Sequence, residues 1–336
     1  MKTAKIKVLS VLLACLMIVS GCSLSQSENG KNKKGNNASD GKLTVVATIF
    51  PEYDWTKNIL GENPGEVELT MLLGSGVDLH SYQPSADDIM AIENCDMFIY
   101  VGGESDEWVE DVLKRSPDEN RVVINRMEVL GDDAKEEEIV EGMEAEEEEE
   151  GEGEEEETEY DEHVWLSLRC AGIFCDAIEE GLVTIDPANK ETYEKNLAAY
   201  HDELDALNTE YVQVCEKASH KTLMFGDRFP FRYLTDDYGL VYYAAFAGCS
   251  AESEASFKTI LFLAEKTEEY NLPAILTIES NDGRIARAVR DNTKDKNQKI
   301  LVLNSMQSVT DADVKAGVTY LGIMEENLEV LKEALK

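Results

Sequence analysis

The sequence is poor in positive charge and in histidine. Its 336 residues include 31 Lys and Arg against 69 Asp and Glu, and only four His. The formal net charge of -38 argues against nucleic acid or an anionic membrane surface as a partner, because the electrostatic term that drives such binding has the wrong sign. A cation is the ligand that this charge favours. With 43% hydrophobic residues, the chain has enough apolar surface for two globular lobes.

Cysteine spacings that hold metals or disulfide frameworks are also missing. None of the seven cysteines forms a CxxC pair, and five of them lie beyond the N-terminal region. Five cannot all pair, so the sequence predicts neither a disulfide framework nor a cysteine zinc site. We expect these five to be mostly buried small hydrophobic residues. They are Cys95, Cys170, Cys175, Cys215 and Cys249.

The hydrophobic run near the N-terminus is too short to span a bilayer. It covers residues 8–19 after a start that contains three lysines, which is typical of a secretory signal. The run ends in Val-Ser-Gly-Cys at 19–22, which resembles the bacterial lipobox, where cleavage precedes the cysteine and the thiol receives a lipid. We therefore predict a signal peptide at 1–21, lipidation of Cys22, and a flexible tether at 22–42 that is rich in Gly, Asn and Ser.

Short apolar runs enriched in β-branched and aromatic residues recur along the rest of the chain. Segments with helical periodicity separate them, and Ser85 with Asp88 three positions later predicts the start of one such helix. Four strands and then four more, alternating with helices, predict an α/β fold of two lobes with mainly parallel sheets, at 43–186 and 219–336. The predicted strands cover residues 42–50, 66–73, 97–102, 121–125, 221–226, 241–246, 274–280 and 299–304.

A single long helix is predicted between the lobes, over 187–218. Apolar side chains recur there in alternating steps of four and three from Tyr193 to Ala218, and Pro187 suits a first helical turn. At 1.5 Å per residue, such a helix is roughly 45 to 50 Å long. We expect it to act as a strut that keeps the separation of the lobes nearly fixed.

The ends of the predicted strands supply candidate metal ligands. In open parallel α/β sheets, ligands bind outside the carboxyl ends of the strands. Two imidazoles from one lobe and one or two carboxylates from the other suit Zn2+, Mn2+ or Fe2+. Each residue alone also has an ordinary alternative role, as a solvated loop histidine or as one acidic residue among many. The candidates are His80 after the second strand, His163 after the fourth, Asp227 at the end of the fifth and Glu279 at the end of the seventh.

Three segments resemble the zinc and manganese solute-binding lipoproteins of bacterial ABC importers. They are VVATIFPEYDWTKNILG at 45–61, GVDLHSYQPS at 76–85 and DEHVWLS at 161–167, with TIES at 277–280 extending the similarity into the second lobe. The resemblance implies two (βα)4 lobes joined by one long helix. It also implies that His80 and His163 are metal ligands.

The resemblance also implies a third ligand, which this sequence lacks at the matching place. Members of that family carry a His or a Glu at the end of the fifth strand, and we assign that position to Gly226, which has no side chain to offer. Asp227 is a doubtful substitute. Arg228 is expected to approach Glu279 and to weaken the site electrostatically.

An acidic insertion at about 131–162 precedes His163. Residues 136–162 contain 18 Asp and Glu and no Lys, Arg or His. Carboxylates at this density repel one another, so the insertion is predicted to be disordered. It either raises the local concentration of divalent cations near the site or serves only as a solubilising loop.

Together these features predict a lipid-anchored receptor on the extracytoplasmic face of a bacterial membrane. It would capture Zn2+, or else Mn2+, between two lobes and deliver it to an ABC permease as a monomer without enzymatic turnover. Two other functions stay open. One is a secreted metal-dependent hydrolase or oxygenase, since two His and a carboxylate also make a reactive site. The other is an adhesin or a binder of a non-metal solute.

Overall fold

Eight strands form two parallel sheets in the computed structural model, which describes residues 42–61, 67–143, 159–250 and 254–336. The first sheet has the order β2-β1-β3-β4 and the second has the order β6-β5-β7-β8, with every strand pairing parallel. All eight strands lie where the sequence predicts them, and the α/β class is confirmed. The strands are β1 (Leu43–Ala47), β2 (Val67–Met71), β3 (Met97–Tyr100), β4 (Val122–Asn125), β5 (Thr222–Phe229), β6 (Val241–Ala247), β7 (Ala274–Thr277) and β8 (Lys299–Val302).

Helices connect the parallel strands, because a parallel pair needs a crossover rather than a tight turn. Local sequence sets their ends. The Ser85 side chain accepts a hydrogen bond from the Asp88 backbone at the start of α2, as predicted. The helices are α1 (Phe50–Leu60), α2 (Ala86–Asn94), α3 (Trp108–Arg115), α4 (Arg126–Leu130), α5 (Leu168–Ile185), α6 (Lys190–Lys217), α7 (Arg232–Tyr238), α8 (Phe257–Glu269), α9 (Arg284–Asp291), α10 (Asp311–Ala316) and α11 (Tyr320–Ala334).

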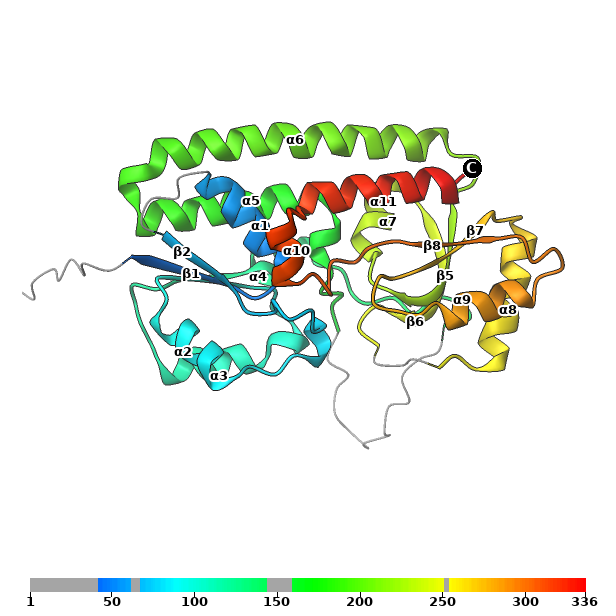
Figure 1. The fold of residues 1–336 in the computed structure, drawn as a ribbon, viewed down its shortest axis with the longest axis horizontal. Helices are drawn as coiled ribbons and strands as arrows, with labels where there is room; N and C mark the ends of the chain where they lie inside the picture. The colour runs from blue at the N-terminus through cyan, green and yellow to red at the C-terminus, as the bar shows by residue number, and fades with distance from the viewer. Residues whose placement is uncertain (1–41, 62–66, 144–158, 251–253) are drawn as a thin grey trace, which may run out of the picture. The chain divides into compact units, whose positions relative to one another are not determined.

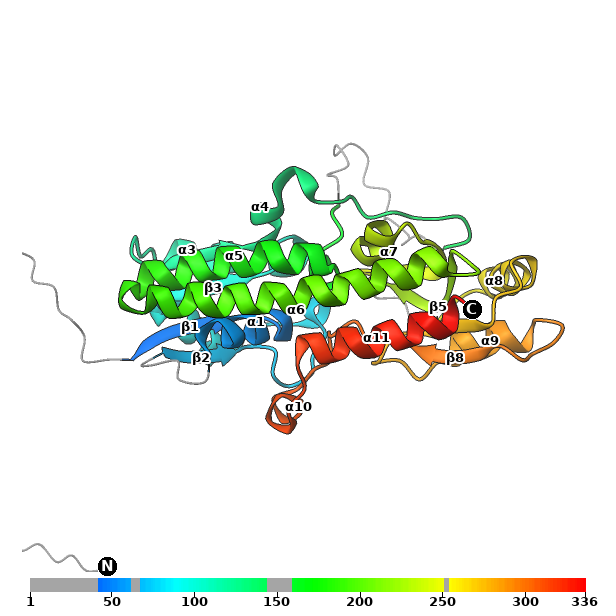
Figure 2. The same cartoon turned by 90° about the horizontal axis from the view of Figure 1, so that it is seen from above.

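The predicted long helix is α6. It is one continuous helix of 28 residues, about 42 Å long, preceded by a 3-10 turn at Pro187–Asn189. One face is buried along its whole length, from Tyr193 to Cys215. It packs on α1 and α5 beside the first sheet and on α7 and α11 beside the second, and both views show it running alongside α5 and α11 (Figures 1 and 2).

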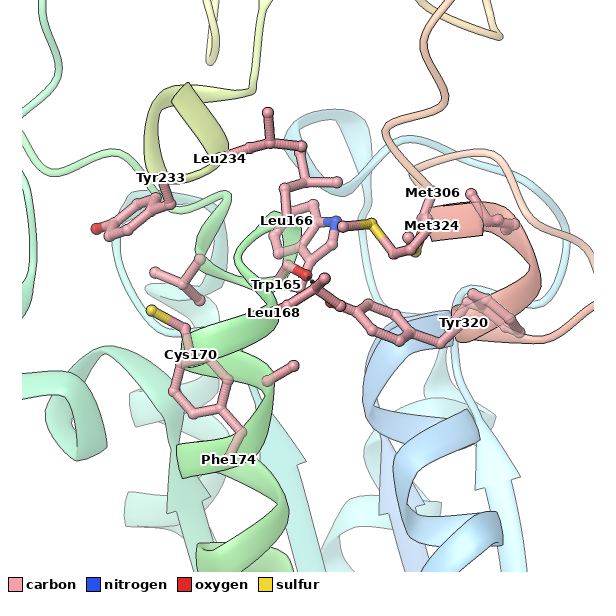
Figure 3. Packing of buried hydrophobic residues seen from close by; sticks show 14 of the residues in the cluster. Trp165, Leu166, Leu168, Cys170, Phe174, Tyr233, Leu234, Met306, Tyr320 and Met324 are labelled. Carbon is pink, nitrogen blue, oxygen red and sulfur yellow. Dashed lines mark hydrogen bonds between the residues drawn. The ribbon is translucent and has the colours of Figure 1, made fainter. Parts of the chain in front are cut away.

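The two sheets are joined by more than this helix, which differs from the simple strut arrangement expected. At the start of α11, the Tyr320 backbone amide donates to Asp54 Oδ2 at 2.9 Å, and its hydroxyl donates to the Trp165 carbonyl at 2.7 Å. The Trp165 indole donates in turn to the Ser305 carbonyl at 2.8 Å. Figure 3 shows Trp165 and Tyr320 among the buried side chains of one hydrophobic cluster, which also includes Phe174 and contains residues from both sheets.

Residues Gly41–Lys336 accordingly form one compact unit. The domain boundaries at 186 and 219 stay a prediction: two smaller hydrophobic clusters lie one in each half, whereas the largest cluster spans both sheets. The physical reason is that α11 follows the second sheet and contacts α1 of the first. Tyr320 of α11 packs edge-on against Trp55 of α1, so aromatic side chains fill the seam, which is the boundary between the two sheets.

The flanks of the acidic insertion make defined contacts, in contrast to the disorder predicted for all of 131–162. Lys135 pairs with Asp236 at 2.7 Å, and Glu138 pairs with Arg232 at 2.9 Å, so a segment that follows the first sheet is fixed on α7 beside the second. Residues 144–158 of the insertion lie outside the described residues.

The predicted signal peptide, Cys22 and nearly all of the tether also lie outside the described residues. Within the described ranges, no helix combines the length and the apolar character needed to cross a membrane. Four of the five body cysteines are buried, as predicted, whereas Cys249 is only partly buried.

Candidate metal centre

His80 lies in the segment that follows β2. It belongs to a short 3-10 turn at Leu79–Ser81, whose first residue is preceded by Asp78. The Asp78 carboxylate accepts a hydrogen bond from the His80 backbone amide at 3.1 Å and so fixes the turn. His80 Nδ1 lies 2.7 Å from the hydroxyl of Ser105, which follows β3. The ring is therefore held by residues that follow β2 and β3, two strands separated by β1 in the sheet, with Nε2 directed away from Ser105.

His163 is reached after β4 and the acidic insertion. Its ring is fully buried beside Trp165, with ring centroids 5.2 Å apart. Its Nδ1 lies 3.0 Å from Asp161 Oδ1, which also accepts the His163 backbone amide at 2.8 Å. A carboxylate accepts but cannot donate while it is ionised, so Nδ1 carries the proton and Nε2 presents a lone pair.

The two predicted imidazoles meet at these nitrogens. His80 Nε2 and His163 Nε2 are 3.1 Å apart, although the residues are separated by 83 positions in the sequence. Two nitrogens bound to one tetrahedral zinc ion at 2.0–2.1 Å lie about 3.3 to 3.4 Å from each other. The observed separation therefore needs very little adjustment to hold such an ion.

A third potential ligand comes from the second sheet. Within the described ranges, His80, His163 and Cys249 form a group in which one ligand atom from each lies within 4.8 Å of the others. Cys249 follows the carboxyl end of β6. Cys249 is not among the ligands predicted from the sequence, because the body cysteines are expected to be mostly buried small hydrophobic residues. Its position after a strand end was the available signal.

Carboxylates surround this group. Asp161 contacts His163, Glu137 Oε1 accepts the Cys249 backbone amide at 3.1 Å, and Glu162 Oε2 lies 3.8 Å from His80 Nδ1. That oxygen of Glu162 is buried and has no hydrogen-bond partner. Such a concentration of negative charge next to neutral nitrogen ligands favours a cation.

Burial sets the protonation of the ligand groups. Burial, followed by the neighbouring His163 ring, lowers the pKa of His80 to about 3, so its imidazole is neutral and able to bind metal near pH 7. Burial, followed by the negative charges of Asp161 and Glu137, raises the pKa of the Cys249 thiol well above its ordinary value. Burial also raises the pKa of the Glu162 carboxyl.

Glu279 lies at the end of β7, as predicted, but its carboxylate is engaged by the turn after β8. It accepts hydrogen bonds from the Ser305 amide at 2.7 Å, the Ser305 hydroxyl at 2.9 Å and the Gln307 amide at 3.0 Å. These contacts join the ends of two neighbouring strands. Glu279 is not a member of the group formed by the two histidines and Cys249.

Asp227 is likewise occupied within its own sheet. It lies at an irregularity in the pairing of β5 with β6. Its carboxylate accepts the Ile278 amide at 3.0 Å and the Asn281 side-chain amide at 2.9 Å, and it also accepts the Thr277 hydroxyl. Asp227 thus links β5 to the end of β7.

The neighbours of Asp227 are placed differently from expectation. Arg228 forms an ion pair with Asp78, beside His80, and not with Glu279. Position 226 faces α9, since a β-carbon on Gly226 would lie 2.4 Å from the Cα of Ala286. Packing of α9 on β5 therefore excludes any side chain at 226, so no ligand could project from that position in this arrangement.

Known proteins with similar sequences include zinc-binding and zinc-uptake proteins. The family model described as zinc-uptake complex component A, periplasmic, matches residues 45–334. The zinc-binding lipoprotein AdcA of Streptococcus pneumoniae is 34% identical over 329 residues, which are 97% of this chain and 61% of AdcA, so the chain spans less than two thirds of that relative. The high-affinity zinc uptake system protein ZnuA of Bacillus subtilis is 33% identical over 97% of both chains.

A solved structure gives the same result. The Zn(II)-bound ZnuA-like domain of Streptococcus pneumoniae AdcA superposes with a TM-score of 0.67 and 30% identity, over 88% of this chain and 99% of that domain. The family match covers nearly all of the described residues, and both sheets lie within it. The chain belongs to the family of the periplasmic zinc-uptake complex component A.

Proposed function

We propose that this protein is the extracytoplasmic substrate-binding component of an ABC importer and that it captures Zn2+ between its two sheets. The observation that carries the proposal is the 3.1 Å separation of His80 Nε2 and His163 Nε2 at the carboxyl ends of the first sheet. Both rings are fixed through Nδ1, so the ligand atoms are positioned before the metal arrives.

The donor atoms favour Zn2+ over Mn2+ as the transported ion. Imidazole nitrogen suits Zn2+, whereas Mn2+ prefers carboxylate and water oxygens. The names of AdcA and ZnuA, which describe zinc binding and zinc uptake, support the same cargo for this chain. Mn2+ is the second candidate for the transported ion. A Glu279 carboxylate ligand would favour Mn2+, because this ion prefers oxygen ligands.

Membrane attachment and delivery complete the proposal. The lipobox-like Cys22 would anchor the protein through a lipid, and the relatives named as lipoproteins support this placement outside the cytoplasm. The partner is the membrane permease of the importer, to which the protein docks as a monomer. Its work is capture, docking and release of the ion, without a chemical reaction.

The proposal is tested by measuring zinc affinity calorimetrically after His80→Ala and His163→Ala. Each change removes one imidazole from a small ligand set, so we expect the affinity to fall on the order of 100-fold or more. His201→Ala is the matched control, because that histidine pairs with Asp176 at 2.8 Å on the surface of α5 and α6. Unchanged affinity in both site variants would show that the metal is held elsewhere.

Glu279 and Asp227 both stay predicted ligands. The same calorimetric titration separates two possible roles of Glu279. If Glu279 binds metal, Glu279→Gln lowers zinc affinity at a nearly constant unfolding midpoint. If it only ties β7 to the turn after β8, the same change lowers the free energy of unfolding and leaves the affinity close to that of the parent. The charged hydrogen bonds that it accepts contribute about 1.5 to 3 kcal/mol each.

A further inference from the structure

We infer that Cys249, whose thiol releases its proton to the solvent when the metal binds, supplies a thiolate ligand from the second sheet, which would give a ligand set of two imidazoles and one sulfur. This inference rests on the proposed function and specifies how the second half of the chain takes part in it. One ligand atom each from Cys249, His80 and His163 lies within 4.8 Å of the other two.

The backbone beside Cys249 is fixed against the metal centre, independently of how the thiol is turned. Gly248 packs on the His163 ring so closely that a β-carbon there would lie 3.0 Å from Cε1 and 3.1 Å from Nδ1. It would also lie 2.9 Å from the Phe229 carbonyl. On the other side, the Cys249 amide donates to Glu137 Oε1 at 3.1 Å. The chain can therefore carry the sulfur only to the neighbourhood of the two imidazoles.

The distances suit a tetrahedral ion. A sulfur at about 2.3 Å and a nitrogen at about 2.0 Å from the same zinc lie roughly 3.5 Å apart, so closure from the observed arrangement needs only a small shift of the thiol. Two imidazoles and one thiolate leave one position of the tetrahedron for water or for a carboxylate.

Charge also favours this set. Zn2+ with one thiolate and two neutral imidazoles has a net charge of +1, which Asp161, Glu137 and Glu162 around it can offset. The cysteine also defines the cargo more sharply, because thiolate ligands select Zn2+ over Mn2+. It explains how a receptor of this kind can hold zinc between the sheets when position 226 cannot bear a side chain.

Cobalt substitution tests the thiolate directly. The full chain is stripped of metal with a chelator under reducing conditions and titrated with Co2+ as the probe. We expect an intense sulfur-to-cobalt charge-transfer band in the near ultraviolet together with visible bands of a tetrahedral ion. Cys249→Ser should abolish the charge-transfer band and weaken zinc binding on the order of 100-fold.

Two further variants define the result. Cys95→Ser is the control, because Cys95 is buried in a separate cluster against β3, and its replacement should leave the band intact. Cys249→His replaces sulfur by nitrogen, so it should recover much of the zinc affinity without the charge-transfer band.

The outcomes distinguish this inference from the proposed function. Visible cobalt bands without a charge-transfer band in the unaltered protein would overturn the thiolate and leave the histidine site standing. Persistence of the band in Cys249→Ser would assign the sulfur to another cysteine and also overturn the inference. If the unaltered protein binds neither Co2+ nor Zn2+, the proposed function and the inference fail together. The spectrum of the unaltered protein decides the presence of a thiolate even if a variant does not fold.

Discussion

Asp106 shows how strongly a single carboxylate responds to its place in this fold. It follows β3 and is almost fully buried. One oxygen accepts the Val101 amide at 2.9 Å and the Gly102 amide at 3.1 Å, while the other oxygen has no hydrogen-bond partner. Burial, followed by the negative charge of Glu52, raises the pKa of Asp106 to about 7. The carboxyl is therefore partly protonated near neutral pH.

A pH dependence of stability follows for Asp106→Asn. Because the folded-state pKa lies above the unfolded value, the folded state binds more protons between about pH 4 and 7, and the contribution of Asp106 to stability is lost as the pH rises through this window. Asparagine does not titrate. The free energy of unfolding of Asp106→Asn relative to the parent should therefore rise by on the order of 3 kcal/mol between pH 4.5 and 7.5.

Urea unfolding followed by circular dichroism at the two pH values measures this difference. Asp111→Asn serves as the control, because Asp111 is an exposed carboxylate on the neighbouring helix α3. A difference between parent and Asp106→Asn that is the same at both pH values would contradict the assignment.

Other residues of the site show that a predicted position can be right while the role is decided elsewhere. His80, His163 and Glu279 lie in segments that follow strands, as the sequence indicates, whereas Asp227 lies within β5. The two imidazoles face each other because each Nδ1 has a partner nearby in the fold. The two carboxylates instead accept hydrogen bonds within the second sheet and its turns.

At the scale of elements, a buried ion pair connects α4 with α1. Arg126 at the start of α4 pairs with Glu52 in α1, with 2.8 Å between Nε and Oε1 and both side chains fully buried. The guanidinium lies over the rings of Trp55 and Trp165, at 5.7 and 5.3 Å from their centroids. The other oxygen of Glu52 accepts the Thr48 amide at 2.8 Å, directly after β1.

Removing one member of this pair should be far more damaging than removing both. Arg126→Met leaves the Glu52 charge buried without a counterion, so we expect a loss of about 3 to 5 kcal/mol in the free energy of unfolding. The double variant Glu52→Gln with Arg126→Met should recover much of that loss. Chemical denaturation of the two single variants and the double variant measures the coupling, and additive losses would contradict it.

The flanks of the acidic insertion act as an element of their own. Glu137 reaches the backbone of Cys249, and Glu138 reaches Arg232 and the hydroxyl of Tyr242, the latter at 3.1 Å. A segment that begins in the first half of the chain therefore supports the loop that carries Cys249. Charge density alone predicts repulsion, but the basic and hydroxyl partners lie on α7 and β6, far along the sequence.

At the scale of the whole molecule, the net charge of -38 includes a dense acidic segment that precedes His163 in the sequence. Residues 144–158 alone contain 11 glutamates and precede His163 by only a few positions. A dense cluster of one charge raises the local concentration of its counterions and speeds their association, within the range that salt allows. We therefore predict that the acidic segment speeds metal association.

Replacing the 11 glutamates of 144–158 by glutamine should slow zinc association about 10-fold at low ionic strength and leave the dissociation rate unchanged. The difference should nearly vanish at 1 M salt, where the Debye length is about 3 Å. Stopped-flow measurements with zinc at two salt concentrations give both rates. Changes of Glu191, Glu194 and Glu210 to Gln on the exposed face of α6 provide a charge control.

Contacts between residues far apart in the sequence join the two halves of the chain, and these are also a property of the whole molecule. The hydrogen bond from Trp165 to Ser305 joins residues 140 positions apart, and that from Tyr320 to Asp54 joins residues 266 positions apart. Together with α6 they hold the seam on which the histidines and Cys249 meet. For the proposed delivery to a permease, we predict that release acts at the loops after β4 and β6, because these contacts oppose a wide opening of the two sheets.

The sequence by itself determined the two α/β sheets, the long helix and the approach of His80 to His163. Alternation of apolar runs is a local property, and parallel strands bring their carboxyl ends to one edge wherever such runs pair. Only the tertiary structure decided that Cys249 joins the histidines, that Arg228 turns to Asp78, and that α11 seals the seam. These features depend on contacts between segments that are distant in the sequence. The same side chain can be buried, paired or available to a metal, according to which distant residues the fold places beside it.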